Sequence, residues 1–251
     1  MTKIALVTGG SRGIGRAIVL SLAQKGIDIV FTYKGNETAA AQVIYEVKNL
    51  NQKAKAFQLD TGNIRGFDAF INTLSQYLND EYQKSNLDFL INNAGIGLYG
   101  GVADTTEETF DAVMNVNFKG VYFLTQKMLP LLNDGGSIVN VSSSLTRVCV
   151  PNVSVYASIK SAIETYTKYL ANELGKRRIT ANVVAPGATA TDFADGATKD
   201  NEERRKLTAS TTALGRVGEP EDIGGVVAFL CSEEAKWVNA QRIEASGGAK
   251  L

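Results

Sequence analysis

The sequence predicts an α/β fold built on a doubly wound parallel sheet of about seven strands, with helices on both faces. Short apolar runs alternate with amphipathic stretches along the chain, which is the pattern of successive βαβ units. The runs 87–91 and 137–141 are apolar enough for burial on both faces, as in parallel sheets. A glycine-rich segment, 8–15, joins the first apolar run to the first amphipathic stretch.

The elements are expected in a regular alternation. Strands are predicted at 4–8, 27–33, 54–59, 87–92, 136–141, 179–184 and 241–244. Helices are predicted at 14–25, 37–50, 64–83, 106–131, 154–174 and 220–231. Thr105 and Glu108 form a capping-box pattern at the start of the fourth helix, and Pro220 suits the first turn of the last one.

No linker, internal repeat or low-complexity segment divides the 251 residues, which predicts a single domain over 1–251. The least regular stretch is 188–215, which is polar and charged and lacks a strand pattern. We expect this stretch to form a substrate flap with a short helix near 201–208.

Composition excludes several classes of function. The formal net charge is zero and no long basic block occurs, so neither nucleic acid nor an anionic membrane surface is an expected partner. No signal segment or bilayer-spanning run is present, and two distant cysteines suit reduced thiols, so we expect a cytoplasmic protein. The chain has no histidine, which excludes Ser-His-Asp and Cys-His catalysis, and no metal site is expected.

The glycine-rich segment predicts a nucleotide site. It reads Thr8-Gly9-Gly10-Ser11-Arg12-Gly13-Ile14-Gly15. Glycines let the backbone turn tightly and approach a pyrophosphate, whose charge the helix N-terminus stabilises. The spacing is Thr-Gly-x-x-x-Gly-x-Gly, which differs from the common dinucleotide pattern Gly-x-Gly-x-x-Gly.

A tyrosine and a lysine suggest acid–base chemistry. Tyr156 and Lys160 are four residues apart in a predicted helix, so their side chains share one face. The lysine charge would lower the tyrosine pKa toward the working range and provide a proton carrier in a chain without histidine. The same spacing also occurs in helices where a lysine stem covers a surface tyrosine.

The motifs, in their order, resemble the short-chain dehydrogenase/reductase family, in the compact branch of β-ketoacyl carrier-protein reductases and related carbonyl reductases. The resemblance implies a Rossmann-type fold and covers essentially the whole chain. The matching positions are 8–15, Asn92-Asn93-Ala94-Gly95, Asn117, Ser143, Tyr156 with Lys160, Pro186-Gly187 with Thr191, and Gly247-Gly248.

The resemblance implies four catalytic roles. Tyr156 is the expected general acid, which protonates a carbonyl oxygen as hydride arrives at the carbon. Lys160 is expected to depress the tyrosine pKa and to hydrogen-bond the nicotinamide ribose. Ser143, chosen over its two serine neighbours on family spacing, is expected to orient the carbonyl, although serines at strand ends also cap turns. Asn117 is expected to hold a water that links Lys160 to solvent.

The expected cofactor is NADP(H). NAD sites commonly place an acidic residue at the end of the second strand, where this chain has Tyr33 and then Lys34. Lys34 and Arg12 could pair with a 2′-phosphate, as basic residues at these places do in the family, or could be solvated surface cations. Asp60 resembles the family residue that contacts adenine, or is a strand-end turn residue. Further contacts are expected from Gly9, Ser11, Gly13, Ile14, Gly15, Asn93, Ala94, Gly95, Tyr156, Lys160, Pro186, Gly187 and Thr191.

The expected substrate is a medium-sized ketone or β-ketoacyl compound in a mostly apolar pocket. The predicted lining is Ile96, Leu98 and Tyr99, the stretch 145–150 with Leu145 and Val150 at its ends, and the flap 188–215 with Phe193. Arg147 could contact an anionic or polar group, or lie at the surface or a subunit interface. The family usually assembles through its fourth and fifth helices, which implies a homodimer or homotetramer, although core packing explains those apolar faces equally well. A nucleotide-binding sensor or scaffold, and a dehydratase or epimerase, remain alternative functions.

Overall fold

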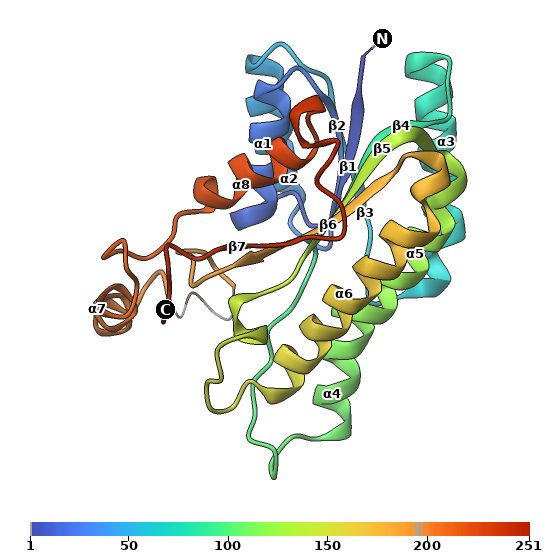
Figure 1. The fold of residues 1–251 in the computed structure, drawn as a ribbon. Coiled ribbons are helices and arrows are strands. Elements are labelled where there is room, and N and C mark those ends of the chain that lie inside the picture. The colour runs from blue at the N-terminus through green and yellow to red at the C-terminus, as the bar shows by residue number, and fades with distance from the viewer. Residues whose placement is uncertain (1, 194–195, 197) are drawn as a thin grey trace.

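Seven parallel strands form one sheet in the computed structural model of the chain, which describes residues 2–193, 196 and 198–251 (Figure 1). The strands are β1 (Ile4–Val7), β2 (Asp28–Tyr33), β3 (Ala54–Gln58), β4 (Leu87–Asn92), β5 (Leu132–Val141), β6 (Thr180–Pro186) and β7 (Arg242–Ala245). They lie in the order β3-β2-β1-β4-β5-β6-β7. The winding reverses between β1 and β4, which is where such sheets bind ligands. The predicted fold class is confirmed.

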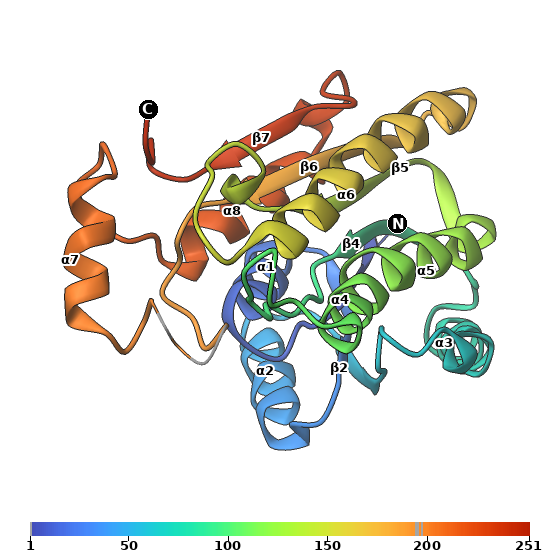
Figure 2. The same cartoon turned by 90° about the horizontal axis from the view of Figure 1, so that it is seen from below.

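Helices cover both faces of the sheet (Figures 1 and 2). One face carries α1 (Gly13–Gln24), α2 (Glu37–Asn49) and α8 (Pro220–Leu230), whose apolar residues share one core cluster. The other carries α3 (Phe67–Tyr82), α5 (Gly120–Met128) and α6 (Ser154–Glu173), which share a second cluster. Further along this face α4 (Glu107–Met114) packs on α6. α7 (Glu202–Ser210) lies to one side of the sheet, within the predicted flap.

The predicted fourth helix is not continuous. α4 ends at Met114, a π-helical turn covers Asn115–Lys119, and α5 follows from Gly120. A π-helical turn inserts a residue without breaking the helical path, so apolar periodicity on either side reads as one helix. The predicted cap is also displaced by one residue, because Thr106 accepts the Thr109 N–H while the Thr105 hydroxyl donates to a loop carbonyl.

The other boundaries agree with the predictions to within a few residues. Pro220 occupies the first turn of α8 as predicted. β5 begins four residues before its expected start at 136, because it pairs with β4 through an irregular register between Leu87 and Phe89. Within the described ranges, no helix has both the length and the apolarity that a bilayer crossing requires.

Candidate active site

A cavity of about 850 Å³ lies at the carboxyl ends of β1, β4, β5 and β6, a volume that suits a small-molecule ligand. It is lined by these predicted residues: Gly9, Ser11, Arg12, Gly13, Ile14, Tyr33, Lys34, Asp60, Asn93, Ala94, Gly95, Ile96, Tyr99, Ser143, Leu145, Val150, Tyr156, Lys160, Pro186, Gly187, Thr191 and Phe193. Gly15, Leu98 and Asn117 are outside the lining. The structure therefore brings most of the predicted site into one cavity.

The glycine-rich loop has a backbone shape that glycine permits. Gly9 and Gly13 adopt φ values of +66° and +53°, where other residues are strained. A Cβ on Gly15 would lie only 2.0 Å from the Gly9 carbonyl oxygen, so Gly15 serves the packing of the loop. The Asn93 side chain donates to the carbonyl oxygens of Thr8 and Gly9 at 2.9 and 3.2 Å. The motif after β4 thus fixes the loop after β1.

The N-terminus of α1 is open to an anion. Arg12 occupies the capping position without a side-chain cap, and the first turn holds no acidic residue. The first N–H groups of a helix have no intrahelical partner, and the helix dipole favours negative charge there. The glycine loop and this helix end together fit the pyrophosphate of a dinucleotide.

The end of β2 carries an ion pair. Lys34 Nζ lies 2.8 Å from Asp60 Oδ2, and this contact lowers the pKa of the Asp60 carboxyl. Tyr33 ends β2 and Lys34 follows it, as the sequence indicated, and Asp60, which follows the neighbouring strand β3, adds a carboxylate beside them. The Lys34 side chain is 74% exposed, so the pair is weak and a bound phosphate can compete for the lysine. Arg12 is exposed and lines the same cavity.

Tyr156 and Lys160 lie together on the buried face of α6. They are 7% and 4% exposed, and Lys160 Nζ is 5.7 Å from the centre of the Tyr156 ring. Lys160 also donates to the Val141 carbonyl oxygen at 2.9 Å. Burial raises the pKa of the Tyr156 hydroxyl, with Tyr99 adding to the rise and Ser143 opposing it. Burial lowers the pKa of Lys160 to about 8.

The predicted lowering of the tyrosine pKa is therefore wrong for this arrangement. Desolvation is the main cause for both groups, because both are taken out of water and their charged forms are disfavoured. Tyr156 is held as the neutral phenol at neutral pH, which is the form that donates a proton.

Ser143 is distinguished from its neighbours by its contacts. The Ser142 hydroxyl donates to Glu164 at 2.8 Å and so serves the packing of α6. Ser144 is buried at the start of a short helical turn. The Ser143 hydroxyl accepts the N–H of Leu145 at 3.2 Å and is also close enough to Tyr156 to lower its pKa. Ser143 thus caps the turn, as one sequence interpretation proposed, and also faces Tyr156; its contact with a carbonyl stays a prediction.

Asn117 is fully buried in the π-helical turn. Its amide nitrogen donates to the carbonyl oxygens of Ile96 and Val113, both at 3.0 Å. Its Oδ1 has no hydrogen-bond partner among the described residues. A Cβ on Gly95 would lie 2.7 Å from this oxygen and 3.6 Å from Lys160 Nζ, so only glycine keeps the two groups within reach. A buried acceptor of this kind fits the expected water.

Aromatic rings line the cavity beside Tyr156. The ring of Tyr99 packs edge-to-face on Tyr156 at 6.1 Å between centres, and Phe193 lies at 5.9 Å. Leu98 and Tyr99 were both predicted to line the pocket, and of the two only Tyr99 lines it. The chain has no regular structure there, so no periodicity indicates which side chains face inward.

The Arg147 side chain is hydrogen-bonded to other residues of the protein. Its guanidinium donates to both carboxylate oxygens of Glu244, at 2.6 and 2.9 Å, and to the carbonyl oxygens of Ala249 and Lys250, at 2.7 and 3.1 Å. Arg147 is not among the described residues that line the cavity, and these bonds favour a structural role over the suggested contact with an anionic substrate.

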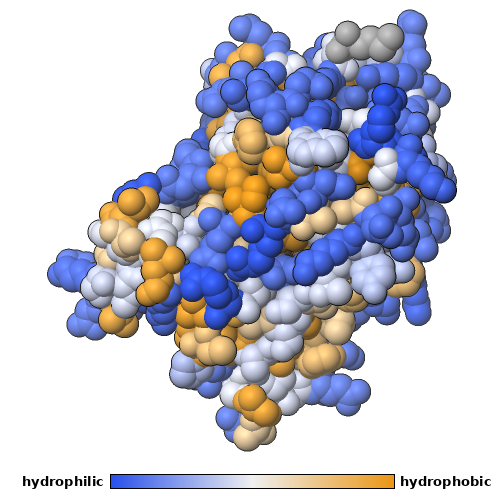
Figure 3. All heavy atoms as spheres, in the orientation of Figure 1, coloured by the Kyte–Doolittle hydropathy of each residue, from blue (hydrophilic) through white to orange (hydrophobic). Residues whose placement is uncertain are grey.

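Further lining residues were not singled out one by one in the sequence. Val148 lies in the predicted stretch 145–150, and Arg204, Leu207 and Thr208 lie in the predicted flap. Val153, Ala249 and Lys250 lie outside every predicted stretch of the lining. The face shown in Figure 3 is mostly hydrophilic, with apolar residues exposed in several places, and Leu207 of α7 is among the exposed apolar residues. A polar surface helix of this kind gives no indication of facing a ligand.

The fold and the site define an oxidoreductase of the Rossmann type. Residues 9–250 match a family model described as enoyl-(acyl carrier protein) reductase. An uncharacterised oxidoreductase of Methylorubrum extorquens is 38% identical over 248 residues, which cover 99% of this chain and 98% of the relative. Versicolorin reductase of Emericella nidulans is 37% identical, covering 98% and 95% of the two chains.

Solved structures agree with these relatives. Angucycline C-6 ketoreductase LanV with bound NADP has a TM-score of 0.94 and 39% identity, over 99% of this chain and 96% of that one. The reductase LugOII, which catalyses keto-reduction at C1 during lugdunomycin biosynthesis, has a TM-score of 0.94 and 36% identity, over 99% and 98% of the chains. The protein belongs to the short-chain dehydrogenase/reductase family, as its motifs predicted.

Proposed function

We propose that the protein is an NADP(H)-dependent oxidoreductase that reduces a ketone to a secondary alcohol. The observation that carries the proposal is a single cavity with two chemically distinct ends. One end has the glycine loop and the uncapped N-terminus of α1, and the other has Tyr156, Lys160 and Ser143. LanV, 39% identical, was crystallised with NADP, which supports the choice of cofactor.

The residues of the chain control the carbonyl oxygen. NADPH, when bound, supplies the hydride. Tyr156, kept protonated by burial, donates its proton to the oxygen as negative charge develops there. Ser143 orients the carbonyl and donates a second hydrogen bond to the same oxygen. The tyrosinate that remains is stabilised by the Lys160 ammonium, 5.7 Å from the ring centre, so the lysine assists after proton transfer.

Asn117 completes the proposed proton path. Its Oδ1 has no hydrogen-bond partner within the described part of the chain. This oxygen and Lys160 Nζ lie 2.7 and 3.6 Å from the place that a Cβ on Gly95 would occupy, so both border the same small space. A water held between them would return a proton toward Tyr156 after each turnover. Asn117 is therefore proposed to position the water that resupplies the tyrosine.

NADP(H) is proposed over NAD(H) because two cations and no β2 carboxylate line this part of the cavity. Arg12 is exposed in the glycine loop, and Lys34 forms a weak pair with Asp60. A 2′-phosphate would pair with both cations and leave Asp60 to accept from the adenine.

The substrate is proposed to be an aromatic or medium-sized apolar ketone. Tyr99 and Phe193 flank Tyr156, and rings prefer such offset and edge contacts with an aromatic ligand. Apolar side chains of Leu145, Val148 and Val150 extend the surface. A LanV structure that contains rabelomycin and the relationship to versicolorin reductase support this class of substrate.

The test is a substrate screen in which NADPH and NADH are compared side by side. Aromatic ketones, aliphatic ketones and β-ketoacyl thioesters are offered, and cofactor oxidation and alcohol formation are measured. We expect one NADPH to be oxidised for each alcohol molecule that forms, and the rate to be highest with aromatic ketones. Cofactor binding without turnover would indicate a sensor or scaffold instead. A product formed without net redox change would indicate a dehydratase or epimerase.

We also propose a homodimer or homotetramer and a cytoplasmic location. Exposed aromatic residues on the α4–α6 side, Phe110, Tyr122 and Tyr169, suit an interface between copies. Cys149 and Cys231 are free thiols, which suits a reducing compartment. Light scattering of the purified protein tests the assembly, and a monomeric mass at micromolar concentration would contradict it.

A further inference from the structure

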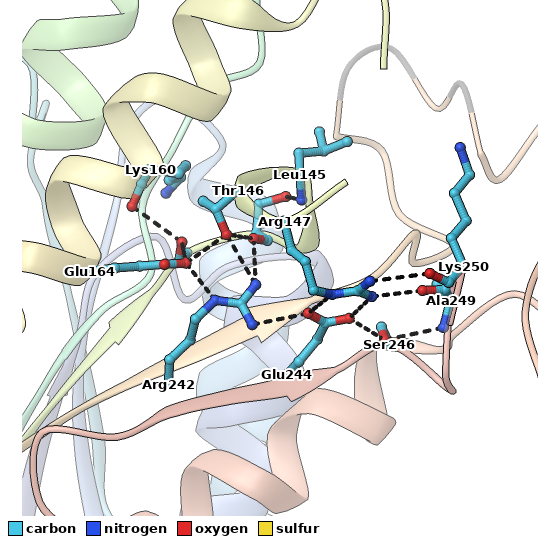
Figure 4. Close-up of polar contacts among 12 residues, drawn as sticks. Leu145, Thr146, Arg147, Lys160, Glu164, Arg242, Glu244, Ser246, Ala249 and Lys250 are labelled. Carbon is cyan, nitrogen blue, oxygen red and sulfur yellow. Dashed lines mark hydrogen bonds and ion pairs between the residues drawn. The ribbon is translucent and has the colours of Figure 1, made fainter. Parts of the chain in front are cut away.

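Four charged residues form a continuous ion-pair chain beside the proposed active site (Figure 4). Glu164 of α6 pairs with Arg242 at 2.8 Å, Arg242 pairs with Glu244 at 2.9 Å, and Glu244 pairs with Arg147 at 2.6 Å. Arg242 and Glu244 are two residues apart on β7, so both side chains lie on one face of the sheet. The signs alternate along the chain of pairs, so every charge has an opposite neighbour.

One end of the ion-pair chain holds the loop that carries Ser143. Arg242 donates to the Ser143 carbonyl oxygen at 3.3 Å and to the Thr146 hydroxyl at 3.0 Å. Glu164 Oε1 lies 2.8 Å from both the Ser142 and the Thr146 hydroxyls. Glu164 is also one helical turn after Lys160. These bonds fix Ser143 relative to the helix that bears Tyr156 and Lys160.

The other end holds the C-terminal segment, residues 246–250. Arg147 bonds the carbonyl oxygens of Ala249 and Lys250, and both residues line the cavity. Glu244 also accepts from the Ser246 hydroxyl at 2.7 Å. The ion-pair chain therefore reaches the edge of the substrate pocket, about 100 residues along the sequence from Ser143.

The C-terminal segment is in turn joined to the end of the predicted flap. The N–H groups of Ala213 and Leu214 donate to the carbonyl oxygens of Gly248 and Gly247, at 3.1 and 3.0 Å. The Lys250 N–H donates to Thr211 at 2.8 Å. Residues 211–214 directly follow α7, whose Arg204 and Leu207 line the cavity.

We propose that Arg147, Glu244, Arg242 and Glu164 are positioning residues that couple the Ser143 loop to residues 211–214 after α7, so that the serine that orients the carbonyl and this wall of the pocket are held in one fixed arrangement. The proposal rests on the proposed reductase function for its catalytic consequence, but the mechanical link is independent of it. Arg147 is the decisive member, because its planar guanidinium makes four hydrogen bonds at once, two of them bidentate to the Glu244 carboxylate, and a lysine ammonium has only three donors and no bidentate geometry.

Amide hydrogen exchange of the whole protein tests the link, with Arg147→Met and Arg147→Lys as variants. Arg177→Met is the matched control. Arg177 also bonds one carboxylate, that of Asp134, and two backbone carbonyls, but its partners lie at the start of β5 or just before it, at the end of the sheet opposite to the cavity.

We expect the amides of Ala213, Leu214 and Lys250 to exchange about ten-fold faster or more in both Arg147 variants, the equivalent of one charge-assisted hydrogen bond. The same amides should keep wild-type rates in Arg177→Met. Arg147→Lys guards against the case in which the methionine variant fails to fold, since it retains the charge beside Glu244. Wild-type protection in both Arg147 variants would overturn the coupling.

Steady-state kinetics with an aromatic ketone tests the catalytic consequence. We expect Arg147→Met to raise KM roughly ten-fold and to leave the NADPH dissociation constant unchanged. Glu164→Gln, which acts on the Ser143 end, should mainly lower kcat. Equal effects on both parameters in all variants would indicate a merely structural role. If no ketone is reduced by the wild type, the proposed function fails, and hydrogen exchange still decides whether the link exists.

Discussion

Replacing Gly15 with alanine tests whether the glycine loop is shaped for a cofactor. The added Cβ would lie 2.0 Å from the Gly9 carbonyl oxygen and 2.6 Å from Asn93 Nδ2. Real Cβ contacts are not closer than 3.0 Å, so the loop must move by about 1 Å, the difference from 2.0 Å. Overpacking of this kind costs about 1–3 kcal/mol, and the better helix propensity of alanine returns at most about 1 kcal/mol.

The expected result is a loss of about 1–2 kcal/mol in the free energy of unfolding and an NADPH affinity at least about ten-fold weaker. Urea denaturation and fluorescence titration measure the two quantities. Gly225→Ala is the control, since Gly225 is an exposed position of α8 where an added Cβ meets nothing within 4 Å. That variant should be unchanged or slightly more stable. The reasoning is refuted if Gly15→Ala matches Gly225→Ala in stability and binds NADPH as the wild type does.

Three further predictions concern charge and proton transfer. Arg12→Ala combined with Lys34→Ala should weaken the binding of NADPH roughly ten- to hundred-fold and that of NADH little. Equal losses of affinity for the two cofactors in titrations would show that neither residue contacts the 2′-phosphate. Ser143→Ala should lower kcat roughly 10²-fold with unchanged NADPH affinity, so near-normal turnover would remove Ser143 from the reaction. Lys160 has a folded pKa of about 8 against 10.5, so the unfolded state binds more protons in this window and stability should rise with pH. The free energy of unfolding of the cofactor-free protein should rise by about 2 kcal/mol between pH 8 and 10. This rise should be absent in Lys160→Met. If the wild type and Lys160→Met show the same dependence of stability on pH, the lowered pKa of Lys160 is contradicted.

The fold was predictable because its signals are local. An apolar run such as 87–92 indicates a buried strand from its own residues alone, and the glycine loop indicates the first strand–helix connection in the same way. The division of 106–131 was not predictable. It depends on one inserted residue near Asn117, and that insertion leaves the apolar periodicity on both sides intact.

Those site residues that belong to a sequence motif were predictable, and contacts between segments far apart in the sequence were not. Tyr156, Lys160 and Ser143 were found by spacing, and the structure places them in one cavity. The pairing of Arg147 with Glu244 joins residues 97 apart, and no periodicity in either segment points to the other. The pKa of Tyr156 was mispredicted for a related reason: the charge of the lysine is visible in the sequence, while the depth of burial is not.

The central claim is that Tyr156 is the proton donor in an NADPH-dependent ketone reduction. Single-turnover kinetics of Tyr156→Phe, with NADPH preloaded and an aromatic ketone added, tests it most directly. The account predicts wild-type NADPH affinity and a hydride-transfer rate lower by roughly 10²–10⁴-fold, the usual contribution of a positioned general acid. A rate close to that of the wild type, at full occupancy by NADPH, would contradict the account.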